Sequence, residues 1–103
     1  MPDTALTDPL GRSIVLLNST WYGHILKGHP ELVRARALVE QAVQMPLEIR
    51  ISNADPNCRL YYGGPRVGIM MQVVANIAQG LVKTAHFAKK RSGGPAEWLP
   101  PNP

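Results

Sequence analysis

The chain has 103 residues, enough for one small domain with a single core and too few for two. Its 11 Lys and Arg against 7 Asp and Glu give a formal charge of +4 at pH 7 and a pI near 9.6. This excess suits an anionic partner such as RNA, DNA or an acidic inhibitor protein. The apolar run 67–78 is too short to span a bilayer, and no secretory signal is visible at the start, so we expect a soluble protein without a membrane partner.

Cys58 is the single cysteine, which excludes an intramolecular disulfide and a cysteine zinc site. A reducing, cytoplasmic location is the simpler interpretation. A peptidase or transferase with Cys58 as its nucleophile is an alternative, but the sequence shows no partner group near it. A small buried thiol is the more frequent explanation of such a residue.

Composition divides the chain into three parts. Residues 1–12 are polar, carry Pro and Gly, and are expected to lie as a lead-in on the surface. Residues 13–91 form the domain. Residues 92–103 contain four prolines, so we expect no regular structure there unless Trp98 anchors this tail to the domain.

The first half of the domain predicts a strand followed by two helices. Residues 13–17 form a short apolar run, typical of a strand. A helix is expected to begin near Trp21 and to end at Gly28, and a second helix to run from Pro30 to Gln44. In an α-helix, His24 and His29 would not lie side by side, because five residues and the joint at Gly28 separate them.

The second half predicts four strands, at residues 47–52, 58–62, 67–75 and 81–87, joined by turns at 53–57, 63–65 and 76–80. Residues 67–75 are apolar on both faces except at Gln72, as in a central strand. In the last strand, Thr84 and His86 should share one face with Val82. We therefore predict an α+β domain in which an N-terminal strand and two helices pack on an antiparallel four-stranded sheet.

The side chains available for chemistry favour RNA cleavage without a metal. The acids are scattered, and neither a metal-binding histidine motif nor a phosphate-binding glycine loop occurs, so we expect no metal and no cofactor. RNA cleavage needs a base for the 2′-OH, an acid for the 5′-oxygen, and fixed positive charge for the phosphorane. Histidines, cations, tyrosines and a threonine can supply these roles.

His24 is the first candidate, as either base or acid, and Arg59 can hold two phosphate oxygens. Tyr61 is expected on the same strand face as Arg59, where it could stack on a base. The alternatives are that His24 is an ordinary surface residue, that His29 only caps a helix, and that Arg59 only solvates an edge strand. The full prediction names as catalytic His24, His29, Arg59, Thr84 and His86, and as RNA-binding Lys27, Tyr61, Lys83, Lys89, Lys90 and Arg91.

Several short motifs are similar to those of a known superfamily: DPLGR at 8–12, WYGHILKGHPE at 21–31, RLYY at 59–62, TAH at 84–86, and a late Trp98. With these, the chain resembles the phage-associated branch of the barnase, EndoU, colicin and RelE-like nucleases. The resemblance implies a RelE- or barnase-like fold and metal-independent cleavage of RNA, often by toxins that a partner protein neutralises. It points to His24, Arg59 and Thr84, and it places His86 where a Tyr is expected.

The sequence thus predicts a small endoribonuclease, the toxin of a toxin–antitoxin or phage-related system, with RNA as substrate and an acidic antitoxin or immunity protein as a second partner. The alternative is a non-catalytic module on the same scaffold that binds nucleic acid or protein. That module would keep its salt-sensitive binding in His24→Ala and lose it on charge reversal at Lys89 and Lys90.

Overall fold

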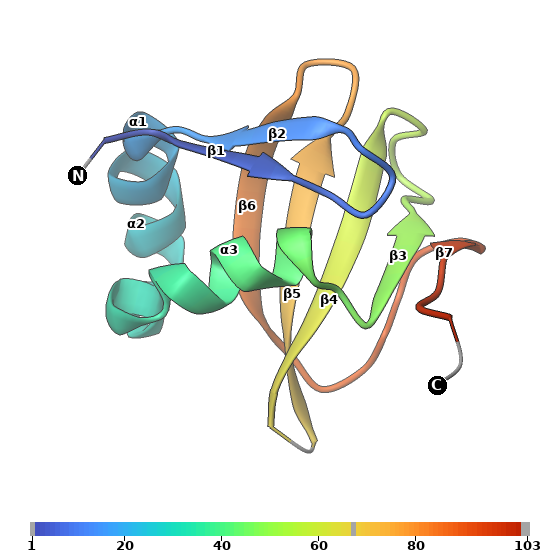
Figure 1. Cartoon of the computed structure of the whole chain (residues 1–103). Helices are drawn as coiled ribbons and strands as arrows, with labels where there is room; N and C mark the ends of the chain where they lie inside the picture. The colour runs from blue at the N-terminus through green and yellow to red at the C-terminus, as the bar shows by residue number, and fades with distance from the viewer. Residues whose placement is uncertain (1, 67, 102–103) are drawn as a thin grey trace.

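The computed structural model describes residues 2–66 and 68–101, and within these residues seven strands form a single sheet in the order β1-β2-β6-β5-β4-β3-β7 (Figure 1). The strands are β1 (Thr4–Thr7), β2 (Ser13–Leu16), β3 (Glu48–Ile51), β4 (Cys58–Arg66), β5 (Ile69–Asn76), β6 (Leu81–Ala88) and β7 (Ala96–Trp98). Figure 1 shows α3 crossing one face of this sheet, and α1 and α2 lying beside its β6 side.

The helices differ in type along the chain. One helical segment comprises α1 (Asn18–Thr20), the π-turn η1 (Trp21–Ile25) and α2 (Leu26–Gly28), so the predicted first helix is present and begins before Trp21. The predicted second helix is divided into the 3₁₀ segment η2 (Pro30–Arg34) and α3 (Arg36–Gln44). The division occurs at Ala35, whose φ of −113° and ψ of 15° lie outside the α-helical range.

The sheet is mixed and larger than predicted. Every strand pair is antiparallel except β2 with β6, which run parallel where Val15 faces Leu81. The prediction of an antiparallel four-stranded sheet is therefore wrong, although the α+β class holds. β5 lies in the middle of the strand order, as its apolar sequence predicted. The predicted start of this strand, Val67, lies outside the described residues.

Both ends of the chain extend the sheet, which corrects the expectation of a loose lead-in and agrees with the alternative for the tail, in which Trp98 anchors it to the domain. Within residues 1–12, β1 pairs along its whole length with β2 and buries Leu6 to 2% exposure. Within residues 92–103, β7 pairs with β3, and Trp98 packs against the core. Short strands of this kind form because a neighbouring strand and the core stabilise them, not because their own sequence favours a strand.

The turn predicted at residues 63–65 is instead part of β4. Gly63 is buried beneath α3, where a Cβ added to the glycine would lie only 2.7 Å from Cβ of Ala42. The absence of a side chain therefore lets the helix approach the strand closely, and the glycine serves helix–sheet packing here instead of a turn.

A β-bulge in the β5–β6 pair changes which residues of β6 face the core. Thr84 lies opposite Val74, but Val82 lies opposite Ala75, so Lys83 is the extra residue. Val82 and Ala85 are both buried in the core, whereas Thr84 and His86 project from the opposite face. The prediction that Val82 shares a face with Thr84 is therefore wrong.

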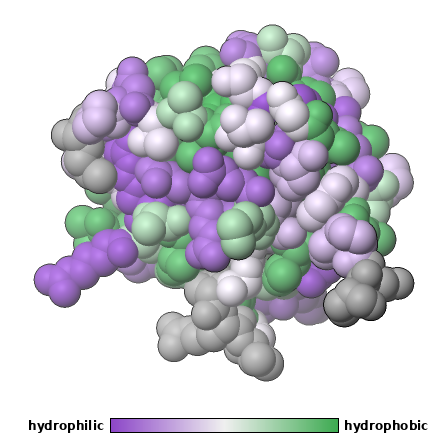
Figure 2. Space-filling view, viewed as in Figure 1, coloured by the Kyte–Doolittle hydropathy of each residue, from purple (hydrophilic) through white to green (hydrophobic). Residues whose placement is uncertain are grey.

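One hydrophobic core lies between the sheet and the helices, and the helical segment contributes Trp21 and Ile25 to it. Polar and apolar residues are interspersed over the surface on the face that carries α3 (Figure 2). Among the residues that the structure describes, no helix combines the length and the apolar character needed to cross a membrane.

Candidate active site

An open cavity of about 390 Å³ lies where the helical segment faces β6. Thr20 and His24 line it from the helix, and Lys83 and Thr84 line it together with Leu81 and Val82 from β6. His24 is exposed and Thr84 is half-buried, so an imidazole, a hydroxyl and an ammonium group border one solvent-accessible space. The cavity thus brings together His24, Lys83 and Thr84, three of the predicted site residues.

A π-turn carries His24 and holds the helical segment against the core. The N–H of Leu26 donates to the carbonyl of Trp21, an i to i+5 bond that widens the turn, and buried Trp21 and Ile25 fix the segment to the core. His24 lies within this turn, whereas His29 follows α2, and each lies near a different part of β6. Such turns occur frequently at functional sites.

His29 contacts His86, the histidine of β6. The ring centroids of His29 and His86 are 5.4 Å apart and their planes are inclined by 31°. Nδ1 of His29 lies 3.3 Å from Oε1 of Glu31, and its side chain is 38% exposed. The helical segment and β6 thus meet at the cavity bordered by His24 and Thr84 and at the contact of His29 with His86, which together we call the histidine seam.

His86 belongs to a chain of hydrogen bonds on the sheet. Its Nδ1 lies 2.9 Å from the carbonyl oxygen of Phe87, and its Nε2 lies 3.1 Å from Nε2 of Gln72. The hydroxyl of Tyr62 donates to Oε1 of Gln72 over 2.9 Å and accepts the N–H of Ser92 over 2.7 Å. Tyr62 is fully buried, so the prediction that this tyrosine packs is confirmed.

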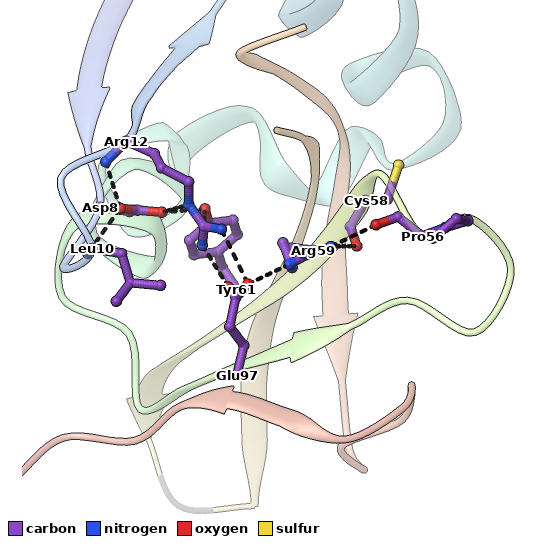
Figure 3. Close-up of polar contacts among 8 residues, drawn as sticks. All are labelled: Asp8, Leu10, Arg12, Pro56, Cys58, Arg59, Tyr61 and Glu97. Carbon is purple, nitrogen blue, oxygen red and sulfur yellow. Dashed lines mark hydrogen bonds and ion pairs between the residues drawn. The ribbon is translucent and has the colours of Figure 1, made fainter. Parts of the chain in front are cut away.

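Arg59 lies in a separate group, which we call the charged cluster: Asp8, Arg12, Arg59, Tyr61 and Glu97 (Figure 3). Arg12 holds Glu97 with two bonds, from Nη1 over 3.2 Å and from Nη2 over 2.6 Å. Arg59 donates its Nε–H to the same carboxylate over 2.7 Å. The guanidinium of Arg59 is therefore already paired, and it does not line the cavity that contains His24.

Tyr61 is fully buried, and its hydroxyl donates to Oδ2 of Asp8 over 2.6 Å. A buried ring offers no face to a base, so the predicted stacking role of Tyr61 does not fit this structure. The residue links the sheet to the β1–β2 hairpin instead, through Asp8.

Ionisation of the cluster reflects burial and opposite charge. Burial alone would raise the pKa of Asp8 and of Glu97, but hydrogen bonds from Tyr61 and Arg12 to Asp8, and from Arg12 and Arg59 to Glu97, lower both below their usual values. Burial and the bond to Asp8 raise the pKa of Tyr61. Both carboxylates therefore remain charged well into acid solution.

The remaining predicted RNA-binding residues lie on the surface. Lys27, Lys83, Lys89 and Lys90 are exposed. Arg91 differs, because its Nη1 donates to Glu48 over 2.9 Å and its charge is thereby paired.

Acidic and basic side chains are not paired to the same extent. Each of the seven carboxylates has an intramolecular contact: Asp3, Asp8, Glu31, Glu40, Glu48, Asp55 and Glu97. Among the described charged side chains, seven have no ion pair, of which two are anions, Asp3 and Asp55, and five are cations: Lys27, Arg34, Lys83, Lys89 and Lys90. The unpaired charge that this surface offers to a partner is therefore mainly positive.

Cys58 is buried to 8% exposure, and its thiol lies 3.7 Å from Asp55. Burial and this carboxylate raise the pKa of the thiol, which disfavours the nucleophilic thiolate. Within residues 2–66 and 68–101, no three side chains of His, Cys, Asp or Glu are grouped as metal ligands would be.

Three residues of the seam were not predicted as site residues: Thr20, Glu31 and Gln72. Glu31 follows His29 by two positions, a spacing in the sequence that can bring a carboxylate to an imidazole. Gln72 was visible as the polar residue of an apolar strand, but its partner on β6 depends on strand pairing.

When the chain is compared with protein-family models, curated proteins and solved structures, none of them matches it.

Proposed function

We propose that the protein is a metal-independent endoribonuclease whose active site is the histidine seam. The observation that carries the proposal is the cavity in which His24, Lys83 and Thr84 border one solvent-accessible space. An imidazole can transfer protons near neutral pH, and an ammonium group can stabilise a phosphorane. The seam therefore has the groups that this reaction requires.

The proposed reaction is transfer of the phosphate to the 2′-oxygen. A base removes the 2′-OH proton, the 2′-oxygen bonds to phosphorus, and the bond from phosphorus to the 5′-oxygen breaks as an acid protonates that oxygen. His24 serves as one of these two groups, Lys83 balances the added negative charge, and Thr84 donates a hydrogen bond to a phosphate oxygen. The products are a 2′,3′-cyclic phosphate and a 5′-hydroxyl end.

This assignment moves the phosphate contact from Arg59 to Lys83. Arg59 is occupied by Glu97 and by the carbonyl oxygens of Pro56 and Cys58, at 2.7 and 3.1 Å from its Nη1. Lys83 is exposed beside the cavity, and its ammonium group contacts only the neutral side chain of Gln79 among the described residues. Its charge therefore remains available to a phosphate.

The unpaired cations also support an anionic partner. A polyanion gains favourable contacts with such a surface whether or not the chain is catalytic. The proposal includes the toxin function implied by the sequence resemblance, in which an acidic protein would occupy the same cations. A small acidic protein encoded beside this chain would be the partner to test for inhibition.

The direct test is incubation of the purified protein with total RNA in EDTA. We expect cleavage that leaves 2′,3′-cyclic phosphate ends, and a loss of about 10²- to 10⁴-fold in rate for His24→Ala, the usual contribution of one proton-transfer group. Gln44→Ala is the matched control, since it removes an exposed, uncharged side chain of α3 outside the cavity. RNA left intact by excess wild-type protein would refute the proposal.

The wild-type protein and the same variants also test the non-catalytic alternative. A binding module would hold RNA without cutting it and would bind equally well as His24→Ala. Charge reversal at Lys89 and Lys90 would weaken that binding. Cleavage by the wild type, lost in His24→Ala while binding persists, favours the enzyme.

A further inference from the structure

The hydrogen bonds of His86 leave neither of its nitrogens free for proton transfer. A carbonyl oxygen can only accept, so the contact with Phe87 requires a proton on Nδ1 of His86. The amide nitrogen of Gln72 donates, so Nε2 of His86 must hold a lone pair. This arrangement places a proton on Nδ1 and engages both nitrogens of His86.

The orientation of the Gln72 amide follows from the bonds behind it. The N–H of Ser92 can only donate, and it donates to the hydroxyl of Tyr62 over 2.7 Å. The hydroxyl of Tyr62 donates to Oε1 of Gln72 over 2.9 Å, and it also lies 3.1 and 3.2 Å from the two oxygens of Ser92. A chain of hydrogen bonds thus runs from the N–H of Ser92 through Tyr62 and Gln72 to His86.

His29 has the opposite arrangement. The carboxylate of Glu31 accepts from Nδ1 over 3.3 Å, so the neutral ring carries its proton there and keeps a lone pair on Nε2. Nε2 of His29 has no hydrogen-bond partner among the described residues. The side chain is 38% exposed, so this lone pair can reach a bound substrate.

His24 and His29 are associated with neighbouring points of β6. His24 lines the cavity together with Thr84, and the ring of His29 lies against His86, two residues further along the strand. Two residues of a strand span roughly 7 Å, so the helical segment brings one histidine to each of two nearby positions on this strand. A base and an acid on opposite sides of one phosphate is the arrangement that the reaction needs.

We infer that His29 is the general base of the site, with Glu31 and His86 as positioning residues, an inference that rests on the proposed function. Nε2 of His29 removes the 2′-OH proton as the 2′-oxygen bonds to phosphorus. Protonated His24 donates its proton to the departing 5′-oxygen. Glu31 fixes the tautomer of His29, and His86 supports its ring.

A substrate whose leaving group needs no proton separates the two roles. Uridine 3′-(4-nitrophenyl phosphate) releases nitrophenolate, so an acid contributes little to its cleavage while the base is still required. We expect His24→Ala to lose at least about 100-fold on RNA but little on this substrate, and His29→Ala to lose at least about 100-fold on both. Gln44→Ala again serves as the control.

The outcomes separate this inference from the proposed function. Wild-type protein that cleaves RNA, with His24→Ala inactive and His29→Ala fully active, overturns the role of His29 alone. The reverse pattern on the activated substrate, with only His24→Ala impaired, exchanges the base and the acid and also overturns it. Wild-type protein that cleaves neither substrate overturns both proposals.

The positioning roles have readouts of their own. Glu31→Gln should lower kcat and leave KM unchanged, and long-range ¹H–¹⁵N spectra should show His29 losing its preference for the Nδ1–H form.

His86→Phe keeps a flat ring beneath His29 and should retain cleavage. If that variant does not fold, Tyr62→Phe provides the test: the His86 spectrum should become a mixture of tautomers while cleavage persists. A wild-type spectrum that places the proton of neutral His86 on Nε2 would overturn the role of His86 as the support for the ring of His29.

Discussion

At the scale of single residues, partners decide what each ionisable group can do. The three histidines illustrate this: His86 has both nitrogens occupied, His29 has one held by a carboxylate, and His24 borders an open cavity. Their differences follow from which donors and acceptors the fold places beside them, and not from the imidazole itself.

The buried carboxylate of Asp8 predicts how stability depends on pH. Its pKa is lowered in the folded protein, so its contribution is present above the unfolded value near 4 and is lost as the pH falls through the folded value. We expect Asp8→Asn to lower the free energy of unfolding at pH 7 by about 2 kcal/mol, typical of hydrogen bonds to a charged group. Urea titrations at pH 7 and pH 3 measure this.

The difference between Asp8→Asn and the wild type should shrink at pH 3, because the wild-type carboxylate begins to be protonated in the unfolded chain. Glu40→Gln is the control, since the Glu40 carboxylate is 26% exposed and pairs with a single arginine. An Asp8→Asn variant as stable as the wild type at pH 7 would contradict a stabilising role for the charged cluster.

The sequence predicted part of the candidate site. His24, Lys83 and Thr84 were all named as site residues, and they do border one cavity. Arg59 and Tyr61 were expected there because strand alternation places them on one face. They do share that face, but Asp8 and Glu97, 53 and 38 positions away in sequence, occupy them. No local pattern reveals partners at such separations.

At the scale of elements, the contact between α3 and β4 depends on a missing side chain. A Cβ at Gly63 would lie 2.7 Å from Cβ of Ala42 and 2.9 Å from its Cα. We expect Gly63→Ala to push the helix from the strand and to lower the free energy of unfolding by about 1–3 kcal/mol, as overpacking does. Thermal and urea unfolding report this change.

Gly23 provides the matched comparison, because a Cβ there would meet nothing within 4 Å. Gly23→Ala removes a flexible residue from the helical segment and should raise stability by about 0.5–1 kcal/mol. Equal effects of the two substitutions would show that backbone freedom, and not the approach of α3, governs both positions.

Elements with a clear periodicity were predicted, and those that depend on neighbours were not. The alternation of β3 and the apolar run of β5 identified both strands. β7 is three residues long in a proline-rich tail, and it forms because Trp98 and Glu97 have partners in the folded protein. The π-turn and the bulge at Lys83 likewise depend on packing, and each changes the direction of side chains that a regular period would have placed elsewhere.

At the scale of the whole molecule, the unpaired charge predicts salt-dependent binding of RNA. Each lysine that contacts a phosphate of single-stranded RNA releases counterions and adds about 0.7 to the slope of log K against log salt. Lys89→Ala with Lys90→Ala should weaken binding and reduce that slope by about 1.4 if both make such contacts. Fluorescence anisotropy with labelled RNA, at salt concentrations from low to physiological, measures the slope.

Arg91→Ala is the control for this prediction, because the charge of Arg91 is already paired with Glu48. It should change the slope less than either lysine substitution. A slope that is unaffected by removing Lys89 and Lys90 would place the phosphate contacts elsewhere on the surface, away from the end of β6.

The bond between Arg12 and Glu97 spans 85 positions of a 103-residue chain. Because a ribosome makes the chain from its N-terminus, Arg12 and Asp8 are synthesised long before the carboxylate that completes their cluster. The β1–β2 hairpin therefore lacks one of its ion-pair partners until residue 97 has been added. A chain truncated before residue 97 is consequently expected to leave the hairpin poorly held and open to proteases.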